Sequence, residues 1–445
     1  MAHDRTTQLV LEGPVSKVLW KLATPNVLAV AMMTGVTFAD AWYVGKLGTQ
    51  ALASLALVFP FLTLMQMMAG GAIGGGTTSA VARAIGAGDK NRAEAIAWHA
   101  LLIAFTMSVI YVMVLGLFAE PIFVLMGGKH GALAGAVDYA QIMFGGAAAT
   151  WFSWVTSAIH RGVGDTVTPA RAIAVASTVQ IALSGVLTLG WLGMPMLGVA
   201  GPAVAWVLCQ GVAAFYLLHR LRVPSSRLRL HRVPFNWQAT GEIMRVGGPG
   251  LANSASMALT VVVTTGYIGT FGTEALAGYG LGARLELMLV PISFGVGAAL
   301  TAAVGVNFGA NQRVRARQIA WTGAAVTLAI TGTLGAAVAI SPSLWLDLFT
   351  TDSDAYAVGM LYLLIAGPFY GFFGAGQSLY FASQGTGNVI VPVCASMARL
   401  IVVIVLGALA IAWDWGTVGL FVAVATGLLL MGLGQAACLF TKAWR

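Results

Sequence analysis

Charged side chains are scarce in this chain of 445 residues. Only 9% of the residues are Asp, Glu, Lys or Arg, whereas 58% are hydrophobic. A soluble domain carries about 25% charged residues, and a soluble protein of this size could not cover its surface with so few. Apolar residues also occur in windows of about 20 or more, long enough to cross roughly 30 Å of hydrocarbon. These features exclude a soluble domain and predict a membrane protein that crosses the bilayer many times.

Residues for metal, disulfide and nucleotide chemistry are also few. The three cysteines each lie alone in an apolar stretch, so they have neither disulfide-framework nor metal-ligand spacing. The six histidines form no HExxH motif, and no G-x-x-x-x-G-K-[ST] motif is present. No arrangement of Ser, His and Asp or of paired carboxylates is visible. We therefore expect no metal, no cofactor and no enzymatic activity.

Apolar runs predict twelve membrane helices. The first run is long, and it lacks the short apolar core of a cleaved secretory signal. We therefore expect it to be retained as a span. The predicted spans are residues 18–44, 50–84, 95–119, 134–160, 168–190, 197–219, 242–269, 276–308, 318–340, 355–383, 389–412 and 416–441.

Basic residues are distributed unequally between the two ends of these spans. When the N-terminus and every second connection are placed on one side, that side holds 19 of the 23 Lys and Arg residues. The other side holds only Lys46 and Lys129, while Arg284 and Arg399 fall within spans. Cytoplasmic loops carry an excess of Lys and Arg. We therefore expect a multi-pass protein of the inner (plasma) membrane with both termini in the cytoplasm.

The densest basic stretch is HRLRVPSSRLRLHR at residues 219–232, between the sixth and seventh spans. Basic stretches of this kind can bind nucleic acid. Beside a membrane, anionic lipid headgroups explain it better. We therefore expect the lipid bilayer and small molecules as partners, and no nucleic acid.

The chain contains an internal repeat of about half its length. Short motifs of the first half return in the second half at a nearly constant spacing, and they lie in different spans. The matched pairs are KLATP (21–25) with RVGGP (245–249), TQALA (49–53) with TEALA (273–277), IGAG (85–88) with FGAN (308–311), IAW (96–98) with IAW (319–321), and RGVGDTVTP (161–169) with QGTGNVIVP (384–392). Each half holds six spans, an even number, so both halves enter the membrane in the same direction, as in a parallel repeat.

The repeat predicts an all-α membrane protein with twelve transmembrane helices in two six-helix lobes that form a V-shaped cleft. We expect an N-lobe at residues 1–220, a basic cytoplasmic linker at residues 221–241 and a C-lobe at residues 242–445. We also expect a monomer. A duplicated scaffold without a cleft is the alternative, but a closed bundle would not need charges within the membrane.

A carboxylate stands in the first span without a counterpart in the second lobe. Residues 38–49 read FADAWYVGKLGT and contain Asp40, whereas the matching phrase at residues 262–273 has Thr264 in that place. One interpretation is an interfacial aspartate in an aromatic belt with Trp42. The other is a functional carboxylate, the usual role of an acid within a membrane. Its absence from the second lobe favours function, because a folding role would be expected in both lobes.

Five polar residues of the C-lobe are candidates to line the cleft. Arg284 and Glu286 are two residues apart on one helix, so their side chains do not face each other. Glu286 is therefore expected to pair elsewhere, and Arg399 is a possible partner across the lobe. A structural ion pair and a substrate contact both remain open for these residues. Asn253 and Gln377 either line the cleft or form hydrogen bonds between helices.

Several motifs together indicate a family. The chain resembles the multidrug and toxic compound extrusion (MATE) transporters over nearly its whole length, and it is most similar to their prokaryotic, DinF-like branch. This resemblance implies two six-helix lobes in a V shape and export of diverse compounds against a proton or sodium gradient. The motifs are Asp40 followed by WYVGKLGT, GAGDKNRAE (86–94), RGVGDTVTP (161–169) and PFYGFFGAGQSLYFASQGTG (368–387).

The resemblance implies roles for residues of the N-lobe. Asp40 matches the ion-coupling aspartate of the family, and Pro25 matches the proline at which the first span can bend. Tyr139 is similar to the tyrosine that joins the hydrogen-bond network of that aspartate. Tyr43 is a further candidate for this network or for substrate contact.

The fifth span departs from the family pattern. Related proteins carry an asparagine and, four residues later, an aspartate that faces the first span, but this chain has Gln180 and Ser184. Trp206 also replaces a threonine that is common in the sixth span. A site with one carboxylate is poor for sodium, which needs several oxygen ligands, but is sufficient for a proton. We therefore predict the proton as the coupling ion, with Asp40 as the switch.

The predicted function is efflux of drugs, toxins or metabolites by proton antiport and alternating access. The expected substrates are small organic compounds, cationic or amphipathic. A sodium-coupled exporter of the same family is one alternative, and a flippase for lipid-linked precursors is another. A flippase would favour several arginines in the cleft, and only Arg284 and Arg399 are available.

Overall fold

The computed structural model describes residues 5–223, 227–350 and 352–444, and within these ranges every regular element is a helix. The elements of the first half are α1 (Arg5–Glu12), α2 (Val15–Gly45), α3 (Thr49–Gln66), η1 (Met67–Ile73), α4 (Gly74–Gly86), α5 (Lys90–Tyr111), η2 (Val112–Gly116), α6 (Ala119–Leu125), α7 (His130–Gly145), α8 (Ala147–Gly162), α9 (Val167–Leu189), η3 (Trp191–Gly193) and α10 (Ala200–Arg222). We refer to α2–α10 as the first bundle.

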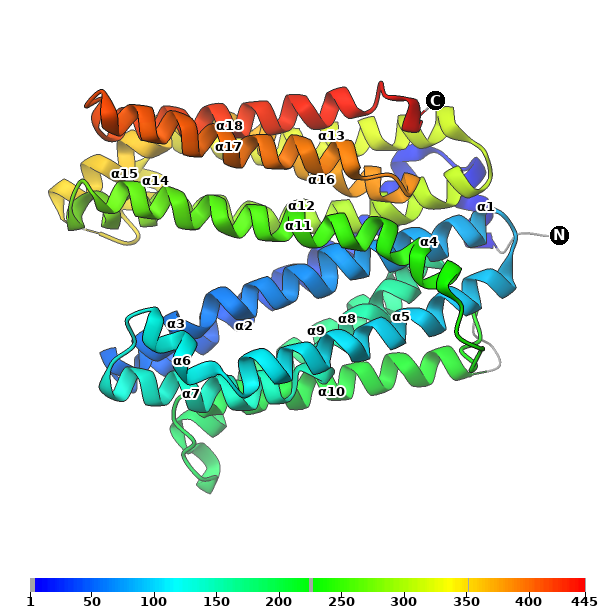
Figure 1. Ribbon diagram of the computed structural model, residues 1–445, viewed down its shortest axis with the longest axis horizontal. Helices are drawn as coiled ribbons and strands as arrows, with labels where there is room; N and C mark the ends of the chain where they lie inside the picture. The colour runs from blue at the N-terminus through cyan, green and yellow to red at the C-terminus, as the bar shows by residue number, and fades with distance from the viewer. Residues whose placement is uncertain (1–4, 224–226, 351, 445) are drawn as a thin grey trace.

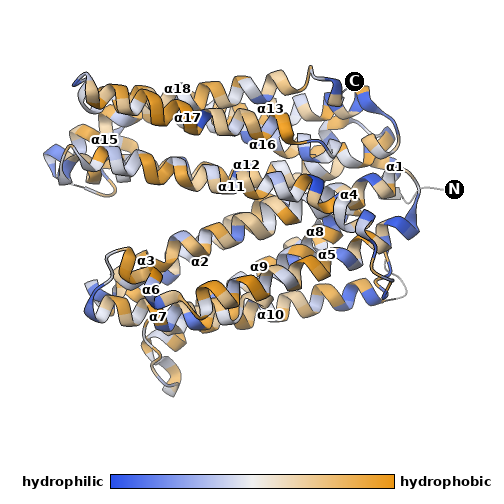
Figure 2. Cartoon of the chain, in the orientation of Figure 1, coloured by the Kyte–Doolittle hydropathy of each residue, from blue (hydrophilic) through white to orange (hydrophobic). Residues whose placement is uncertain are grey.

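The second half contains α11 (Trp237–Gly269), α12 (Thr273–Gly309), α13 (Arg313–Ile340), α14 (Ser343–Leu346), α15 (Ser353–Ala366), η4 (Gly367–Phe369), α16 (Tyr370–Thr386), α17 (Ile390–Ala412), α18 (Gly416–Cys438) and η5 (Lys442–Trp444). We refer to α11–α18 as the second bundle. Hydrophilic residues gather mainly at the two ends of the bundles, and the middle of the helices is mostly apolar (Figure 2).

The helices are long enough to confirm a protein that crosses the membrane many times. Eleven helices of the described residues are long and apolar enough to span a bilayer. A twelfth span arises where α7 and α8, which are bent by 47° relative to each other, count as one. Gly146 lies at this bend, and a Cβ atom there would meet Val207 of α10 at 2.5 Å. The twelve predicted spans therefore agree with the structure when this bent pair is one span.

The two bundles meet at one end of the molecule and diverge toward the other (Figure 1). Both chain termini lie at the end where the bundles meet, which we call the closed end. There α4 packs against α11, α12 and α16, and α2 packs against α12. A buried apolar cluster also joins α1 and the start of α2 to α12, α13 and α16. The arrangement is the V shape that the repeat predicted.

Repeat-related residues make matching contacts at the closed end. A Cβ atom at Gly86 would overlap the carbonyl oxygen of Val306, and a Cβ atom at Gly309 would overlap the carbonyl oxygen of Arg83. The internal repeat exchanges these two pairs, because it relates position 86 to position 309 and position 83 to position 306. Helices α4 and α12 therefore cross on the pseudo-two-fold axis, where only glycine permits such a close approach.

Two equivalent turns start the fifth span of each half. The repeated motifs RGVGDTVTP and QGTGNVIVP each contain a Gly-x-Gly sequence, at residues 162–164 and 385–387. Gly164 and Gly387 have φ angles of 80° and 79°, which favour glycine. The first glycine of each motif lies instead within the last turn of a helix, α8 or α16. Only the second glycine is therefore required for the turn.

The connection between the bundles packs against α5. The backbone amide of Arg229 donates to Glu94 Oε1 at 3.0 Å, and the amide of Asn236 donates to His99 Nε2 at 2.8 Å. Beyond it, Arg92 of α5 forms an ion pair with Glu242 of α11 at 2.7 Å. Protein contacts therefore hold this connection, and its contact with lipid headgroups stays a prediction.

Candidate functional site

Asp40 lies inside the first bundle, with only 8% of its surface exposed. The hydroxyl of Ser184 in α9 donates a hydrogen bond of 2.5 Å to Asp40 Oδ1. Gln180, one turn earlier in α9, faces the same carboxyl group. The Nε2 atom of Gln180 nevertheless has no hydrogen-bond partner among the described residues. The structure thus brings together Asp40, Gln180 and Ser184, which the sequence had predicted to share one site.

Close packing of α2 on α9 creates this arrangement. Gln180 and Ser184 share a helix face because they are four residues apart, and both are buried. The next residue is Gly185, and a Cβ atom there would lie 2.6 Å from the ring of Tyr43. Tyr43 also contacts the ring of Trp191, with 5.8 Å between the ring centroids. Tyr43 therefore holds α2 on α9 by packing, and it makes no hydrogen bond to Asp40.

Two further helices contribute residues near Asp40. Tyr139 of α7 and Cys209 of α10 are close enough to interact with Asp40 electrostatically. No hydrogen bond connects Tyr139 with the carboxyl group, and its part in a hydrogen-bond network stays a prediction. Trp206 of α10 donates from Nε1 to Thr150 Oγ1 at 2.9 Å. Cys209 is packed in a buried apolar cluster with Ala176 and Ala213.

Asp40 has no cationic partner among the residues that the structure describes. The ion pairs found within those residues involve Glu94, Asp165, Glu242 and Glu286 instead. The described parts of the chain also hold no group of three His, Cys, Asp or Glu residues that could bind a metal ion. A lone buried carboxyl group with a hydroxyl donor can take up and release a proton, since the neutral form avoids the cost of a buried charge.

Pro25 lies within α2, which continues through it as one helix from Val15 to Gly45. A proline in a helix leaves the carbonyl four residues earlier without its usual partner, here that of Lys21. The next residue, Asn26, is buried and donates from Nδ2 to the carbonyl of Leu22 at 3.1 Å. The helix is therefore weakened at one position, about four turns from Asp40.

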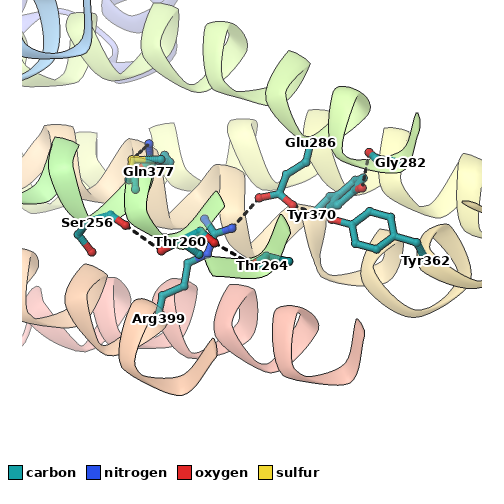
Figure 3. Close-up of polar contacts among 10 residues, drawn as sticks. Ser256, Thr260, Thr264, Gly282, Glu286, Tyr362, Tyr370, Gln377 and Arg399 are labelled. Atoms are coloured by element: carbon teal, nitrogen blue, oxygen red, sulfur yellow. Dashed lines mark hydrogen bonds and ion pairs between the residues drawn. The ribbon is translucent and has the colours of Figure 1, made fainter. Parts of the chain in front are cut away.

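The second bundle contains a buried ion pair. Arg399 Nη2 lies 2.6 Å from Glu286 Oε1, and the hydroxyl of Tyr362 donates to Glu286 Oε2 at 2.8 Å (Figure 3). The guanidinium of Arg399 also lies over the ring of Phe373, 5.2 Å from its centroid. The predicted pairing of Arg399 with Glu286 is confirmed. Glu286 is thus neutralised by a cation, whereas Asp40 is not.

The other candidates of the second bundle differ in their surroundings. Asn253 and Gln377 are buried, and each has a side-chain oxygen without a hydrogen-bond partner among the described residues. Gln377 Nε2 makes a 3.5 Å contact to the sulfur of Met257 (Figure 3). Arg284 is exposed and makes no ion pair within the described parts of the chain. Contact of any of these residues with substrate stays a prediction.

Arg161 is a residue that the sequence misplaced. It directly follows the predicted span 134–160, so the sequence counts it among the basic residues of the connections. In the structure it is buried at the end of α8, where Thr78 and Gln384 line the same small cavity. The internal repeat could have identified Arg161 as unusual, because the matching position of the second half holds the neutral residue Gln384.

Comparison with known proteins assigns the family. The MatE family model matches residues 25–186 and 249–409, one match in each half of the chain. The chain belongs to the MatE family. The two matched segments reflect the internal repeat. The family is one of transporters, so the chain is not an enzyme.

Curated relatives and a solved structure agree with the MatE assignment. The FAD transporter of Shewanella oneidensis is 26% identical over 368 residues, which cover 81% of this chain and 80% of the relative. The probable multidrug resistance protein NorM of Thermotoga maritima is 27% identical over 380 residues, which cover 85% and 82%. A solved outward-facing multidrug resistance MATE family transporter of the MOP superfamily is 23% identical, with a TM-score of 0.89 and coverage of 97% and 96%. The fold is therefore that of solved MATE transporters.

Proposed function

We propose that this chain exports drugs, toxins or metabolites by secondary active transport, in exchange for protons, with Asp40 as the protonation switch. The observation that carries the proposal is the difference between two carboxylates within the membrane. Glu286 is paired with Arg399 at 2.6 Å, so its charge is compensated in the fold. Asp40 is comparably buried but has only a hydroxyl donor, Ser184, and the facing amide of Gln180. A carboxylate without a cation is the one that gains by taking up a proton.

Movement of the two halves against each other would turn protonation into transport. We propose residues 1–220 and 242–445 as the two lobes and residues 221–241 as their linker. The positive-inside distribution of basic residues supports a cytoplasmic location for both termini and hence for the closed end. The state described here is then open to the outside. Parting of the closed end and approach of the other end would complete the cycle.

Protonation of Asp40 would act through α2. The neutral carboxyl group no longer requires a polar partner, so its contact with Ser184 can be given up at lower cost. The carbonyl that Pro25 leaves unpaired offers a place for α2 to bend. A bend there would shrink the space inside the first bundle and displace substrate to the outside. Deprotonation would restore it. Protonation of Asp40 must therefore weaken substrate binding, and bound substrate must weaken proton binding by the same factor.

Sodium coupling is the alternative for the ion. A hard cation is bound by several oxygen ligands, and the oxygens that surround Asp40 come from Gln180 and Ser184 rather than from a second carboxylate. This composition supports the proton. The motifs quoted for the resemblance support a place in the DinF-like branch of the family, which we propose as well.

The names of the relatives suggest two substrate classes. NorM of Thermotoga maritima is named a probable multidrug resistance protein, which favours cationic or amphipathic drugs. The Shewanella oneidensis relative is named a FAD transporter, which makes an anionic metabolite a second candidate. We propose drug efflux as the main activity and metabolite export as the second.

Ethidium uptake into everted membrane vesicles, which corresponds to export from the cell, tests the proposal. Ethidium uptake into the vesicles is measured with a pH gradient and, separately, with a sodium gradient at constant pH. The proposal expects uptake with the pH gradient alone. Uptake driven by sodium at constant pH would contradict proton coupling, and no uptake with either gradient would contradict the export function.

A further inference from the structure

Arg161 is a buried cation without a counter-charge. Only 3% of its surface is exposed, and its side chain makes no hydrogen bond or ion pair with any residue that the structure describes. Other arginines inside the protein do have polar partners: Arg399 pairs with Glu286, and Arg83 donates to Ser79 Oγ and to the carbonyl of Gly385. A buried charge without a partner is costly. Folding alone therefore gives no reason for an arginine at this position.

The Arg161 side chain lines a small cavity between the two bundles at the closed end. Thr78 lines it from the first bundle, and Thr301 and Gln384 line it from the second. The cavity has a volume of about 10 Å³, room for roughly one water molecule. No larger ion fits in this state.

The internal repeat shows which feature of this cavity is unusual. Thr78 and Thr301 occupy matching positions of the two halves, and they make equivalent bonds. Thr78 donates to the carbonyl of Ala158 at 3.0 Å, and Thr301 donates to the carbonyl of Phe381 at 2.8 Å. Arg161 and Gln384 also occupy matching positions, since they begin the paired motifs RGVGDTVTP and QGTGNVIVP.

The same position is therefore neutral in one half and cationic in the other. Gln384 is satisfied, because its Nε2 donates to the carbonyl of Gly71 at 2.8 Å. The second half thus folds with a neutral amide where the first half has a guanidinium. A cation kept in one half only, buried and unpaired, points to a ligand that is not part of the fold.

We propose that Arg161 binds the phosphate group of an organic phosphate when the two bundles part at the closed end. This inference rests on the alternating access of the proposed function. Gln384 now packs against Gly75, where a Cβ atom would overlap its amide. Separation of the bundles takes Gln384 away from Gly75 and opens the cavity beside Arg161.

Phosphate suits the groups that would then be accessible. The guanidinium presents a planar fork of N–H donors that matches a phosphate group, and such charged hydrogen bonds strengthen where water is excluded. Thr78 lines the same cavity, but its hydroxyl already donates to the carbonyl of Ala158, so the guanidinium of Arg161 carries the recognition. The side that opens faces the cytoplasm in the proposed orientation, where a substrate for export would enter. The phosphate can belong to a soluble metabolite or to a lipid headgroup.

Binding of a matched pair of flavins to the purified protein tests this. Riboflavin and its 5′-phosphate, FMN, fluoresce alike and differ only in the phosphate group. We expect wild type to bind FMN more tightly than riboflavin. Arg161→Gln, which copies the repeat partner, should weaken FMN binding at least about tenfold, as loss of a buried charge partner does, and leave riboflavin binding unchanged. Arg161→Lys keeps the charge but not the fork, so a smaller loss is expected.

Arg171→Gln is the matched control, because Arg171 is an exposed basic residue of α9 near the same end. It should bind both flavins as wild type does. A second arm replaces FMN with short-chain phosphatidic acid. Loss confined to FMN in Arg161→Gln assigns a soluble substrate, and loss confined to phosphatidic acid assigns a lipid. Equal binding of both phosphates by wild type and Arg161→Gln, or no binding of either by wild type, overturns the proposal.

Ethidium efflux driven by a pH gradient, measured on the same preparations, separates this inference from the proposed function. Arg161→Gln should retain ethidium efflux, because the cation carries no phosphate, and this also shows that the variant folds. If wild type exports ethidium but Arg161→Gln does not weaken phosphate binding, the inference is refuted and the proposed function is not. Absence of ethidium efflux from wild type refutes the proposed function. If Arg161→Gln does not fold, Arg161→Lys decides, since equal FMN binding by Arg161→Lys and wild type contradicts a forked contact.

Discussion

Removal of Arg399 should destabilise the protein far more than removal of the whole ion pair. At 2.6 Å the attraction between Arg399 and Glu286 amounts to roughly 6 kcal/mol at an effective dielectric constant of about 20. Most of it offsets the loss of hydration, because the side chains are only 8% and 13% exposed. Arg399→Met leaves a buried carboxylate that retains only the hydroxyl of Tyr362. We expect a loss of about 3–5 kcal/mol, as for other broken buried pairs.

A double-mutant cycle measures this directly. The free energy of unfolding is determined in detergent for wild type, Arg399→Met, Glu286→Gln and the double variant. We expect the double variant to be within about 1–2 kcal/mol of wild type, because replacing a buried ion pair by uncharged groups is often nearly neutral. A loss below about 1 kcal/mol in Arg399→Met, or a double variant as unstable as Arg399→Met, would show that the pair does not compensate the charge of Glu286.

Three further outcomes are expected. Gly86→Ala and Gly309→Ala each force α4 and α12 apart, at a cost of about 1–3 kcal/mol. The conformation in which the bundles meet at the closed end should therefore lose roughly 5- to 150-fold in population relative to the conformation in which they part there. Ethidium efflux by both variants should fall accordingly. Gly35→Ala is the control and should leave efflux unchanged, because nothing lies within 4 Å of the added Cβ. Equal efflux by all three variants would refute the close crossing of α4 and α12. Burial alone would raise the pKa of Asp165, but hydrogen bonds from His160 and Thr168 outweigh it and hold that pKa below its usual 3.8. The folded-state pKa is thus the lower one, so Asp165 stabilises the fold above about pH 4, and this contribution is lost on further acidification. Asp165→Asn should lower the thermal unfolding midpoint at pH 7 and have less effect below about pH 4. If the difference in midpoint between wild type and variant grows on acidification, the pKa of Asp165 is raised by folding instead of lowered. Ser184→Asp supplies a second carboxylate beside Asp40, so it should give sodium-driven ethidium uptake, which wild type should lack. Sodium-driven uptake by wild type would show that one carboxylate is enough for sodium.

The fold was largely predictable because hydrophobic length and repetition are both sequence properties. Spans of about 20 apolar residues identify membrane helices with little ambiguity. The even number of spans per half predicted a parallel repeat, and the matching contacts of Gly86 and Gly309 agree with it. The bend between α7 and α8 was not predictable, since it depends on the approach of Val207 in another helix to Gly146.

The candidate site was predictable where residues are near in sequence or hold a charge within the membrane. Gln180 and Ser184 share a face because they are four residues apart. The pairing of Arg399 with Glu286 followed from the cost of leaving either unpaired. The packing of Tyr43 against Gly185 was not predictable, because it depends on the approach of α2 to α9, and the role of Tyr43 in the network or in substrate contact stays a prediction.

The burial of Arg161 could not be read from local pattern. A basic residue at the end of a span ordinarily faces the headgroups. Here the crossing of α4 with the second bundle covers it, and that crossing depends on contacts between residues of opposite halves, such as Gly86 and Val306. Comparison of the two halves residue by residue, rather than motif by motif, would have shown the unequal pair.

The pH dependence of substrate binding by wild type and Asp40→Asn tests the central claim most directly. Binding of tetraphenylphosphonium, a cation that does not titrate, is measured on purified protein from about pH 5 to about pH 8, a range in which buried carboxyl groups titrate. The account predicts that wild type binds more weakly as the pH falls, because protons and substrate oppose each other. It also predicts that Asp40→Asn binds with an affinity independent of pH. A wild-type affinity that is flat over this range, or an equal pH dependence in Asp40→Asn, would contradict the role of Asp40 as the proton switch.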